Sequence, residues 1–114
     1  MSKYKDTIYA LSTPTGKSAI AVIRISGDKS LNILKKISLI KKITPNKTKL
    51  TILSFQKQII DQVLVVFFKK PNSFTGEEMI EINCHGSTAI ITKITQILEI
   101  LGTRLAEPGE FTRR

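Results

Sequence analysis

The chain has 114 residues, 41% of them apolar, which suits one domain built around a single buried core. Eighteen basic residues against nine acidic ones give a formal charge of +9, which favours an anionic partner such as RNA or a polyanionic small molecule. No apolar run is long enough to span a bilayer, the first residues are polar, and one cysteine excludes an internal disulfide. We therefore expect a cytoplasmic protein without a membrane segment.

The charge alone leaves the partner open. Most of the basic residues are lysines scattered among isoleucine, asparagine and threonine, a composition that also arises without any nucleic-acid role. No arginine-rich helix, zinc finger or aromatic RNA-binding pattern accompanies them. Direct RNA binding is therefore one alternative among others.

Segments rich in β-branched and aromatic residues predict the strands. They lie at 7–11, 19–26, 50–55, 59–68 and 79–84. The stretch 63–68 is apolar on both faces, so its strand is expected in the middle of the sheet, and 50–55 should form a hairpin with 59–68. Residues 104–106 are too few for more than a brief edge strand.

Two helices are expected from apolar residues at intervals of three and four. The first runs through about Ile37 and is capped by Asp28 or Ser30, and the second spans 87–101 with Ser87 as its cap and Gly102 after its end. Pro108 and Gly109 suit the entry to another helix, and the last residues begin a segment that we expect to continue in a longer protein. Together the predicted strands and helices indicate an α/β (α+β) fold, in which a mixed sheet of about five strands packs against two or three helices.

One short motif resembles a nucleotide-binding loop. Gly16, Lys17 and Ser18 end like the pattern G-x-x-x-x-G-K-S, but the first glycine would fall at Leu11. Such a loop opens a helix, whereas residues 19–26 predict a strand. We therefore interpret 12–18 as a tight connection between neighbouring strands, and a self-sufficient nucleotide hydrolase is not favoured.

Two charged residues stand out within the predicted strands. Arg24 is the one charge on a strand that is otherwise apolar on both sides, so it either reaches water at the strand end or pairs with an acid of the domain or a ligand carboxylate. Glu81 follows an ordered loop at 71–76 and shares a strand face with Asn83. It is either a ligand-binding carboxylate or the solvated face of an edge strand.

Cys84 and His85 are adjacent but do not predict a reactive pair. Neighbouring strand residues point to opposite faces, and one cysteine with one histidine is too few for a closed zinc site. We expect no catalytic residue and no metal ligand in this chain.

Several separated stretches carry a family resemblance in matching order and approximate spacing. They are Asp6-Thr7-Ile8, Thr13-Pro14 with Gly16, Ile23-Arg24-Ile25-Ser26-Gly27, Asn72-Ser73-Phe74-Thr75-Gly76-Glu77, His85-Gly86, and Ala106 with Pro108-Gly109-Glu110-Phe111-Thr112. Together they resemble the N-terminal domain of the tRNA modification GTPase MnmE (TrmE) family. The resemblance covers residues 1–114 and implies that the helical and GTPase domains of the family are absent here.

The resemblance implies a fold and a function. The fold is that of the tetrahydrofolate-binding domain of folate-dependent aminomethyltransferases, and the domain would bind a one-carbon folate such as 5-formyltetrahydrofolate and form a homodimer. With the FAD protein MnmG (GidA), the full protein would install a (carboxymethyl)aminomethyl group at C5 of the wobble uridine of tRNA. GTP, potassium and magnesium would belong to the absent GTPase domain, and this chain alone would not be catalytic.

The family's folate contacts carry over onto Arg24 and Glu81. Glu81 would accept paired hydrogen bonds from the pterin, whose N–H and amino groups lie side by side, and Arg24 would hold an anionic or carbonyl part of the folate. The resemblance implies a further lysine beyond Arg114, so the pocket is expected to be incomplete. Where the family often has glycine, this chain has Ser18, Ala19 and Ser87. The alternative is a basic tRNA-docking module that binds no folate.

Overall fold

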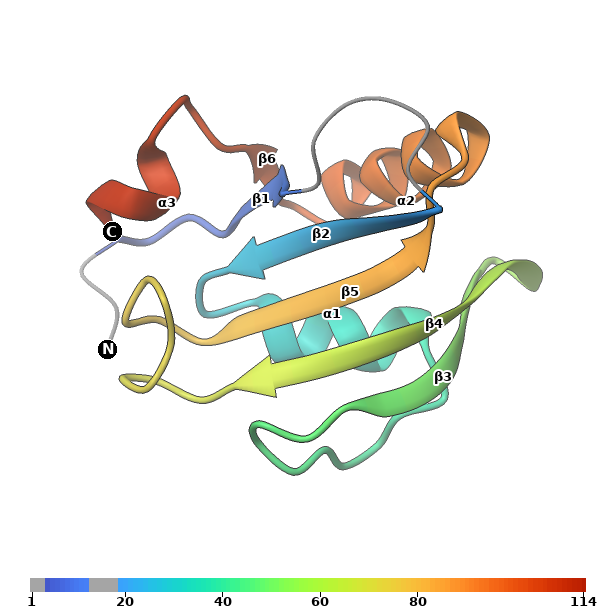
Figure 1. Ribbon diagram of the computed structural model, residues 1–114, viewed down its shortest axis with the longest axis horizontal. Helices are drawn as coiled ribbons and strands as arrows, with labels where there is room; N and C mark the ends of the chain where they lie inside the picture. Colours follow the sequence, from blue (N-terminus) through green and yellow to red (C-terminus); the bar gives the residue numbers. More distant parts are fainter. Residues whose placement is uncertain (1–3, 13–18) are drawn as a thin grey trace.

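The computed structural model describes residues 4–12 and 19–114, in which six strands form one sheet in the order β3-β4-β5-β2-β1-β6 (Figure 1). All neighbouring strands are antiparallel except β1 and β6, which are parallel. The strands are β1 (Ile8–Leu11), β2 (Ile20–Ser26), β3 (Lys49–Phe55), β4 (Gln58–Phe68), β5 (Met79–His85) and β6 (Arg104–Leu105). The prediction of a mixed α+β sheet is confirmed, with β6 as a sixth strand at the edge.

Two helices, α1 (Ser30–Ile37) and α2 (Thr88–Ile100), cover one face of the sheet and lie behind it in Figure 1. Alternate residues of the strands point into this layer. In β2 these are Ala21, Ile23 and Ile25, and each is at most 2% exposed. Burying such side chains contributes about 1.5 to 3 kcal/mol each. Neither α1 nor α2 covers the opposite face of the sheet, and that open face holds the predicted site residues.

The predicted strands and turns agree closely with the structure. The strand containing 63–68 is an interior one, because β4 pairs with β3 on one side and β5 on the other. Gln56 and Lys57 join β3 to β4 with positive φ at both positions, the backbone that a tight hairpin turn requires. The loop predicted at 12–18 lies outside the described residues apart from Ser12, and the strands on either side of it are antiparallel neighbours.

The helix caps were only partly predictable. Ser87 caps α2 as expected, and its side chain accepts a hydrogen bond from the Ile90 backbone N–H. The predicted cap of α1 by Asp28 or Ser30 is wrong, because Lys29 occupies the cap position and the Thr7 hydroxyl, from before β1, accepts its backbone N–H at 3.1 Å. Gly27 has a φ of 136°, and a Cβ there would lie 2.6 Å from Thr7 Oγ1. Only glycine fits this close approach.

Candidate ligand-binding site

Arg24 and Glu81, the two predicted site residues, lie directly opposite each other. They are register partners in the antiparallel pair of β2 and β5, at the centre of the sheet and on its open face. Arg24 Nε donates to Glu81 Oε2 at 3.3 Å. Pairing of Arg24 with an acid of the domain, one of the predicted alternatives, is therefore what the structure contains. Glu81 is not on an edge strand, because β5 is paired on both sides.

The contact between these two side chains is single and accessible. The side chains of Arg24 and Glu81 are 36% and 23% exposed. Among the described residues, the terminal guanidinium nitrogens of Arg24 and Oε1 of Glu81 have no hydrogen-bond partner. A half-exposed pair of this kind stabilises a fold by only about 0 to 1 kcal/mol. Donors and acceptors therefore remain free for a ligand.

A hollow of about 640 Å³ lies beside Arg24. Its walls come from β1 and the residue after it, from the loop before β5, and from the segment between β6 and the end of the chain. The lining residues are Ala10, Leu11, Ser12, Arg24, Phe74, Leu105, Ala106, Glu107, Pro108, Gly109, Glu110, Phe111 and Thr112. Its volume is that of pockets for small-molecule ligands, about 300 to 1,000 Å³. Glu81 is not in this lining, so Arg24 connects the hollow to the carboxylate.

The loop before β5 is held by hydroxyl and carboxylate contacts. Ser26 Oγ, at the end of β2, lies 2.7 Å from Thr75 Oγ1 and donates to Glu77 Oε1 at 2.7 Å. Ser73 Oγ donates to the Glu77 carbonyl. These bonds leave Phe74 64% exposed at the rim of the hollow. An exposed aromatic ring beside an arginine offers a stacking surface for a flat ligand.

A network of arginines and carboxylates, which the sequence did not reveal, reaches the hollow at Glu110. Arg114 is 1% exposed at its side chain and contacts Asp6 at 2.6 Å, Glu77 at 3.1 Å and Glu110 at 3.0 Å. Arg104 grips Glu110 through both terminal nitrogens, at 2.8 and 2.6 Å. The network ties α3 (Glu110–Arg113) to the N-terminal segment, beside which it lies in Figure 1.

Stability at low pH is expected to depend on Glu110. Hydrogen bonds from Arg104, opposed by burial, lower the pKa of Glu110 from 4.5 to about 2. Because the folded pKa is depressed, its stabilisation is present above about pH 4.5 and is lost as the pH falls towards 2. Urea unfolding followed from about pH 7 to about pH 2 should therefore show a shallower pH dependence in Glu110→Gln than in the wild type. Glu107 is an exposed carboxylate in the same turn, so Glu107→Gln is the matched control variant. An equal pH dependence in the wild type and in Glu110→Gln would contradict the assignment to Glu110.

Cys84 and His85 diverge, as their adjacency in a strand predicts. Cys84 is buried in the core, and this burial raises the pKa of its thiol to about 11, so it is not a reactive nucleophile. The exposed His85 ring contacts Asp61 through Nδ1 at 2.7 Å. Among the described residues, no group of three or more histidine, cysteine or acidic side chains is arranged to hold a metal ion.

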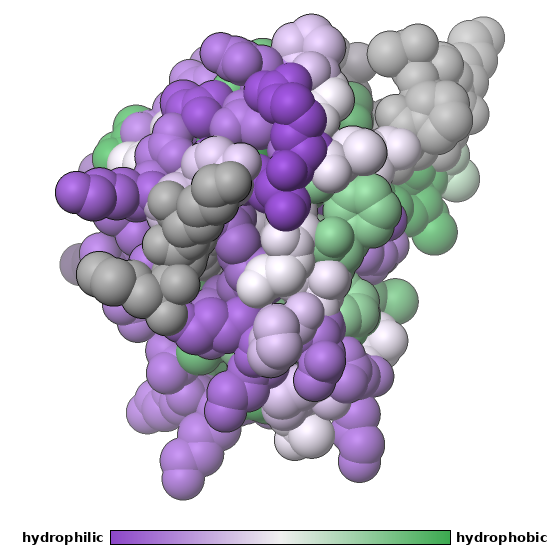
Figure 2. All heavy atoms as spheres, turned by 90° about the vertical axis from the view of Figure 1, so that its left-hand side faces the viewer, coloured by the Kyte–Doolittle hydropathy of each residue, from purple (hydrophilic) through white to green (hydrophobic). Residues whose placement is uncertain are grey.

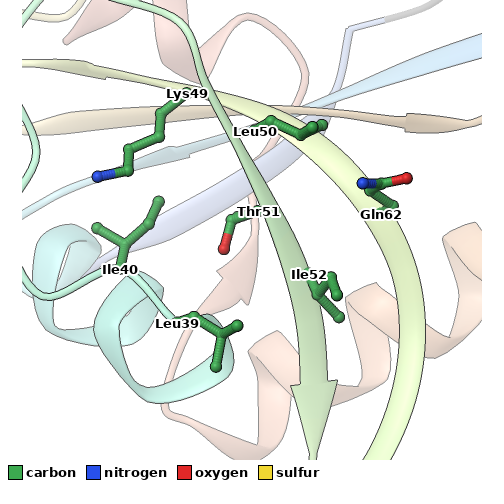
Figure 3. A pocket seen from close by; sticks show the side chains of 7 residues that line it. All are labelled: Leu39, Ile40, Lys49, Leu50, Thr51, Ile52 and Gln62. Carbon is green, nitrogen blue, oxygen red and sulfur yellow. The ribbon is translucent and has the colours of Figure 1, made fainter.

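Two smaller hollows among the described residues are less suited to a folate-sized ligand. One of about 270 Å³ lies at the edge strand β3, where Leu39, Ile40 and Lys49 meet (Figure 3). A second, of about 170 Å³, lies on the open face between β4 and β5. Within the described ranges, no helix has the length and apolar character needed to cross a membrane.

In comparisons with known proteins, nearly the whole chain matches one protein family. A family model described as "GTP-binding protein TrmE N-terminus" matches residues 7–114. The tRNA modification GTPase MnmE of Sulfurovum sp. (strain NBC37-1) is 44% identical over 113 residues, which cover 98% of this chain and 25% of that protein. The protein of the same name from Pseudothermotoga lettingae is 51% identical over 111 residues (96% and 25%), and that from Fervidobacterium nodosum is 50% identical over 116 residues (96% and 25%). The chain spans about a quarter of the length of these relatives.

Proposed function

The chain belongs to the TrmE N-terminal family, and on that premise we propose that it is the folate-binding and dimerisation domain of a tRNA-modifying GTPase. The observation that carries the proposal is the direct opposition of Arg24 and Glu81 on the open face of the sheet, beside a hollow of about 640 Å³. The name tRNA modification GTPase describes the relatives as whole proteins, and this chain matches about a quarter of their length. Their activity as whole proteins is therefore part of the proposal.

The residues present fit a reduced folate. A pterin offers an N–H and an amino group side by side, and Glu81 has an unpaired oxygen to accept from them. Arg24 has terminal nitrogens to donate to a carbonyl or carboxylate of the ligand, and Phe74 offers a ring at the rim of the hollow. The folate would supply a one-carbon unit. The protein's part is to bind and orient it.

The remaining elements of the proposal concern the whole protein. It would be cytoplasmic and act with MnmG (GidA), an FAD protein, to install a (carboxymethyl)aminomethyl group at C5 of the tRNA wobble uridine. GTP, potassium and magnesium would be bound by a GTPase domain outside this chain. The sequence of this chain supports that division, because the residues after its Gly16-Lys17-Ser18 motif form strand β2 and not the helix that a phosphate-binding loop needs.

Folate binding is tested with two ligands that differ in the pterin. We expect 5-formyltetrahydrofolate to bind the chain with saturation in calorimetry, and p-aminobenzoylglutamate, which lacks the pterin, to bind far more weakly. The comparison separates recognition of the pterin, which the proposal assigns to Glu81, from non-specific attraction of an anion to a basic protein. If both ligands bind equally, or neither binds, the proposal that the chain binds folate is contradicted.

Dimerisation is expected to use the open face of the sheet. Ile20, Leu50 and Leu64 are 57%, 58% and 43% exposed there, and a second copy of the chain would remove these side chains from water. Leu64→Lys should therefore shift the chain towards monomer in sedimentation velocity, because it places a charge in the contact. Ile100→Lys, which makes the same change on an exposed position of α2, should leave the assembly state unchanged. Equal effects of both changes, or none, would count against this face.

A further inference from the structure

The positive charge of the chain is concentrated in one part of the sequence. Residues 29–60 contain eight of the eighteen basic residues and no acidic residue. The eight lysines are Lys29, Lys35, Lys36, Lys41, Lys42, Lys47, Lys49 and Lys57. This stretch forms α1, the loop after it and β3, so the charge is carried by neighbouring elements.

Three of these lysines surround a hollow, which we call the lysine hollow. It is about 210 Å³ in volume and is lined by Lys42, Ile43, Thr44, Lys47, Thr48 and Lys49. All three lysines are exposed, and none of them forms an ion pair with a described residue. Three lysines and two threonines therefore line a concave surface that has no carboxylate residue in its lining.

The fold holds the lysine hollow in place and adds further charge beside it. The Asn46 backbone N–H donates to the Phe67 carbonyl at 2.8 Å, which fixes the turn against the end of β4. Lys69 and Lys70 are exposed and follow that strand directly. Figure 2, which views the molecule from the left-hand side of Figure 1, shows hydrophilic side chains projecting at the lower end of the molecule. Figure 3 shows Lys49 extended on the side of β3 where Leu39 and Ile40 lie.

Each of the four arginines of the chain contacts a carboxylate. Arg24 contacts Glu81, Arg113 contacts Glu107, and Arg104 and Arg114 share Asp6 and Glu110. The acids are thus largely engaged by arginines, and the excess of positive charge is left on lysines. A point charge on a flexible stem suits a phosphate group and does not read bases.

We propose that the lysine hollow binds the phosphodiester backbone of tRNA, an inference that rests on the proposed place of this chain in a tRNA-modifying protein. The hollow is at the β3 edge, and Arg24 and Glu81 are on the central strands β2 and β5, so tRNA and folate occupy separate surfaces. Lysine and threonine contacts to phosphate carry no sequence information. Recognition of particular tRNAs would then come from elsewhere in the full protein.

The test compares two triple variants with the same change of charge. Lys42→Gln/Lys47→Gln/Lys49→Gln removes the hollow's cations, and Lys5→Gln/Lys57→Gln/Lys93→Gln removes exposed lysines from three other places. Binding of a tRNA transcript with uridine at the wobble position is measured by fluorescence anisotropy at about 50 to 300 mM salt. The first triple variant should bind the tRNA roughly tenfold more weakly at low salt. The fall of log K with log salt should also become less steep, by about 3 in the magnitude of the slope. A lysine-to-arginine triple at the same positions should bind like the wild type.

Three results would overturn the inference. They are the absence of wild-type binding at about 50 mM salt, an equal loss in both triple variants, and unchanged binding in the first triple. Titration of 5-formyltetrahydrofolate into the same proteins keeps the two proposals apart. If the third result comes with a fall in folate affinity in the first triple, the lysines serve the smaller anion and not tRNA. If no folate binds but tRNA binding depends on the hollow, the folate proposal fails and this inference stands.

Discussion

Replacing Glu77 with glutamine is expected to lower the free energy of unfolding by about 3 kcal/mol, because it removes the negative partner of a buried ion pair and leaves the positive one. Glu77 is 5% exposed and contacts Arg114, whose side chain is 1% exposed, at 3.1 Å. It also accepts a hydrogen bond from Ser26. The change leaves the guanidinium buried with less compensating charge. The loss should appear in urea unfolding at neutral pH as a lower midpoint with an unchanged slope.

The neighbouring residue provides the matched control. Glu78 is half-buried, and its carboxylate accepts the Lys70 backbone N–H at 3.1 Å, so Glu78→Gln should cost less than about 1 kcal/mol. Combining Glu77→Gln with Arg114→Met should cost less than the sum of the two single changes, because the two side chains are coupled. Equal effects of Glu77→Gln and Glu78→Gln would show that the network does not hold the loop before β5.

Glu81→Ala is expected to weaken binding of 5-formyltetrahydrofolate by about 2 to 3 kcal/mol, roughly 30- to 150-fold in Kd. The change removes the carboxylate proposed to accept both pterin donors, and no other carboxylate lies on the open-face side of β5. Folding stability should change little, since the ion pair to Arg24 is half-exposed. Calorimetric titration gives the affinity, and urea unfolding gives the stability of the same protein.

Asn83→Ala is the control for this prediction. Asn83 lies two residues further along the same face of β5, and its side chain donates weakly to the Leu64 carbonyl at 3.4 Å. Its removal should change folate affinity less than threefold, on the order of 0.5 kcal/mol. A similar loss in Asn83→Ala and Glu81→Ala would mean that the face matters and the carboxylate does not.

The sequence was sufficient to single out Arg24 and Glu81 but not to place them together. Each is a charge in a strand whose other residues are largely apolar, and this local pattern can be read without a structure. Their opposition depends on the register of β2 against β5, and those strands are separated by α1 and the hairpin of β3 and β4. Strand pairing over such a distance is a tertiary property.

The features that sequence reasoning missed share the same cause. Arg114 and Asp6 are 108 positions apart, so no spacing rule connects them. The Thr7 hydroxyl accepts the backbone N–H of Lys29, the residue at the α1 cap position, from 22 positions earlier, and no local pattern indicates this contact. The sixth strand was predicted only as a short possibility, because two residues carry no periodicity. Contacts between segments close in the sequence, such as the β3–β4 hairpin and the Ser87 cap, were predictable, and contacts between distant segments were not.

The central claim is that a folate binds at Arg24 and Glu81, and backbone amide shifts measured by NMR during a titration test it most directly. A reduced folate is an anion, so a basic protein could also attract it to the lysine hollow. We predict that 5-formyltetrahydrofolate shifts amides of β2 and β5 around Arg24 and Glu81 and those near Phe74, with saturation at one ligand per chain. Shifts confined to residues 42–49, or no shifts at saturating ligand, would contradict the account.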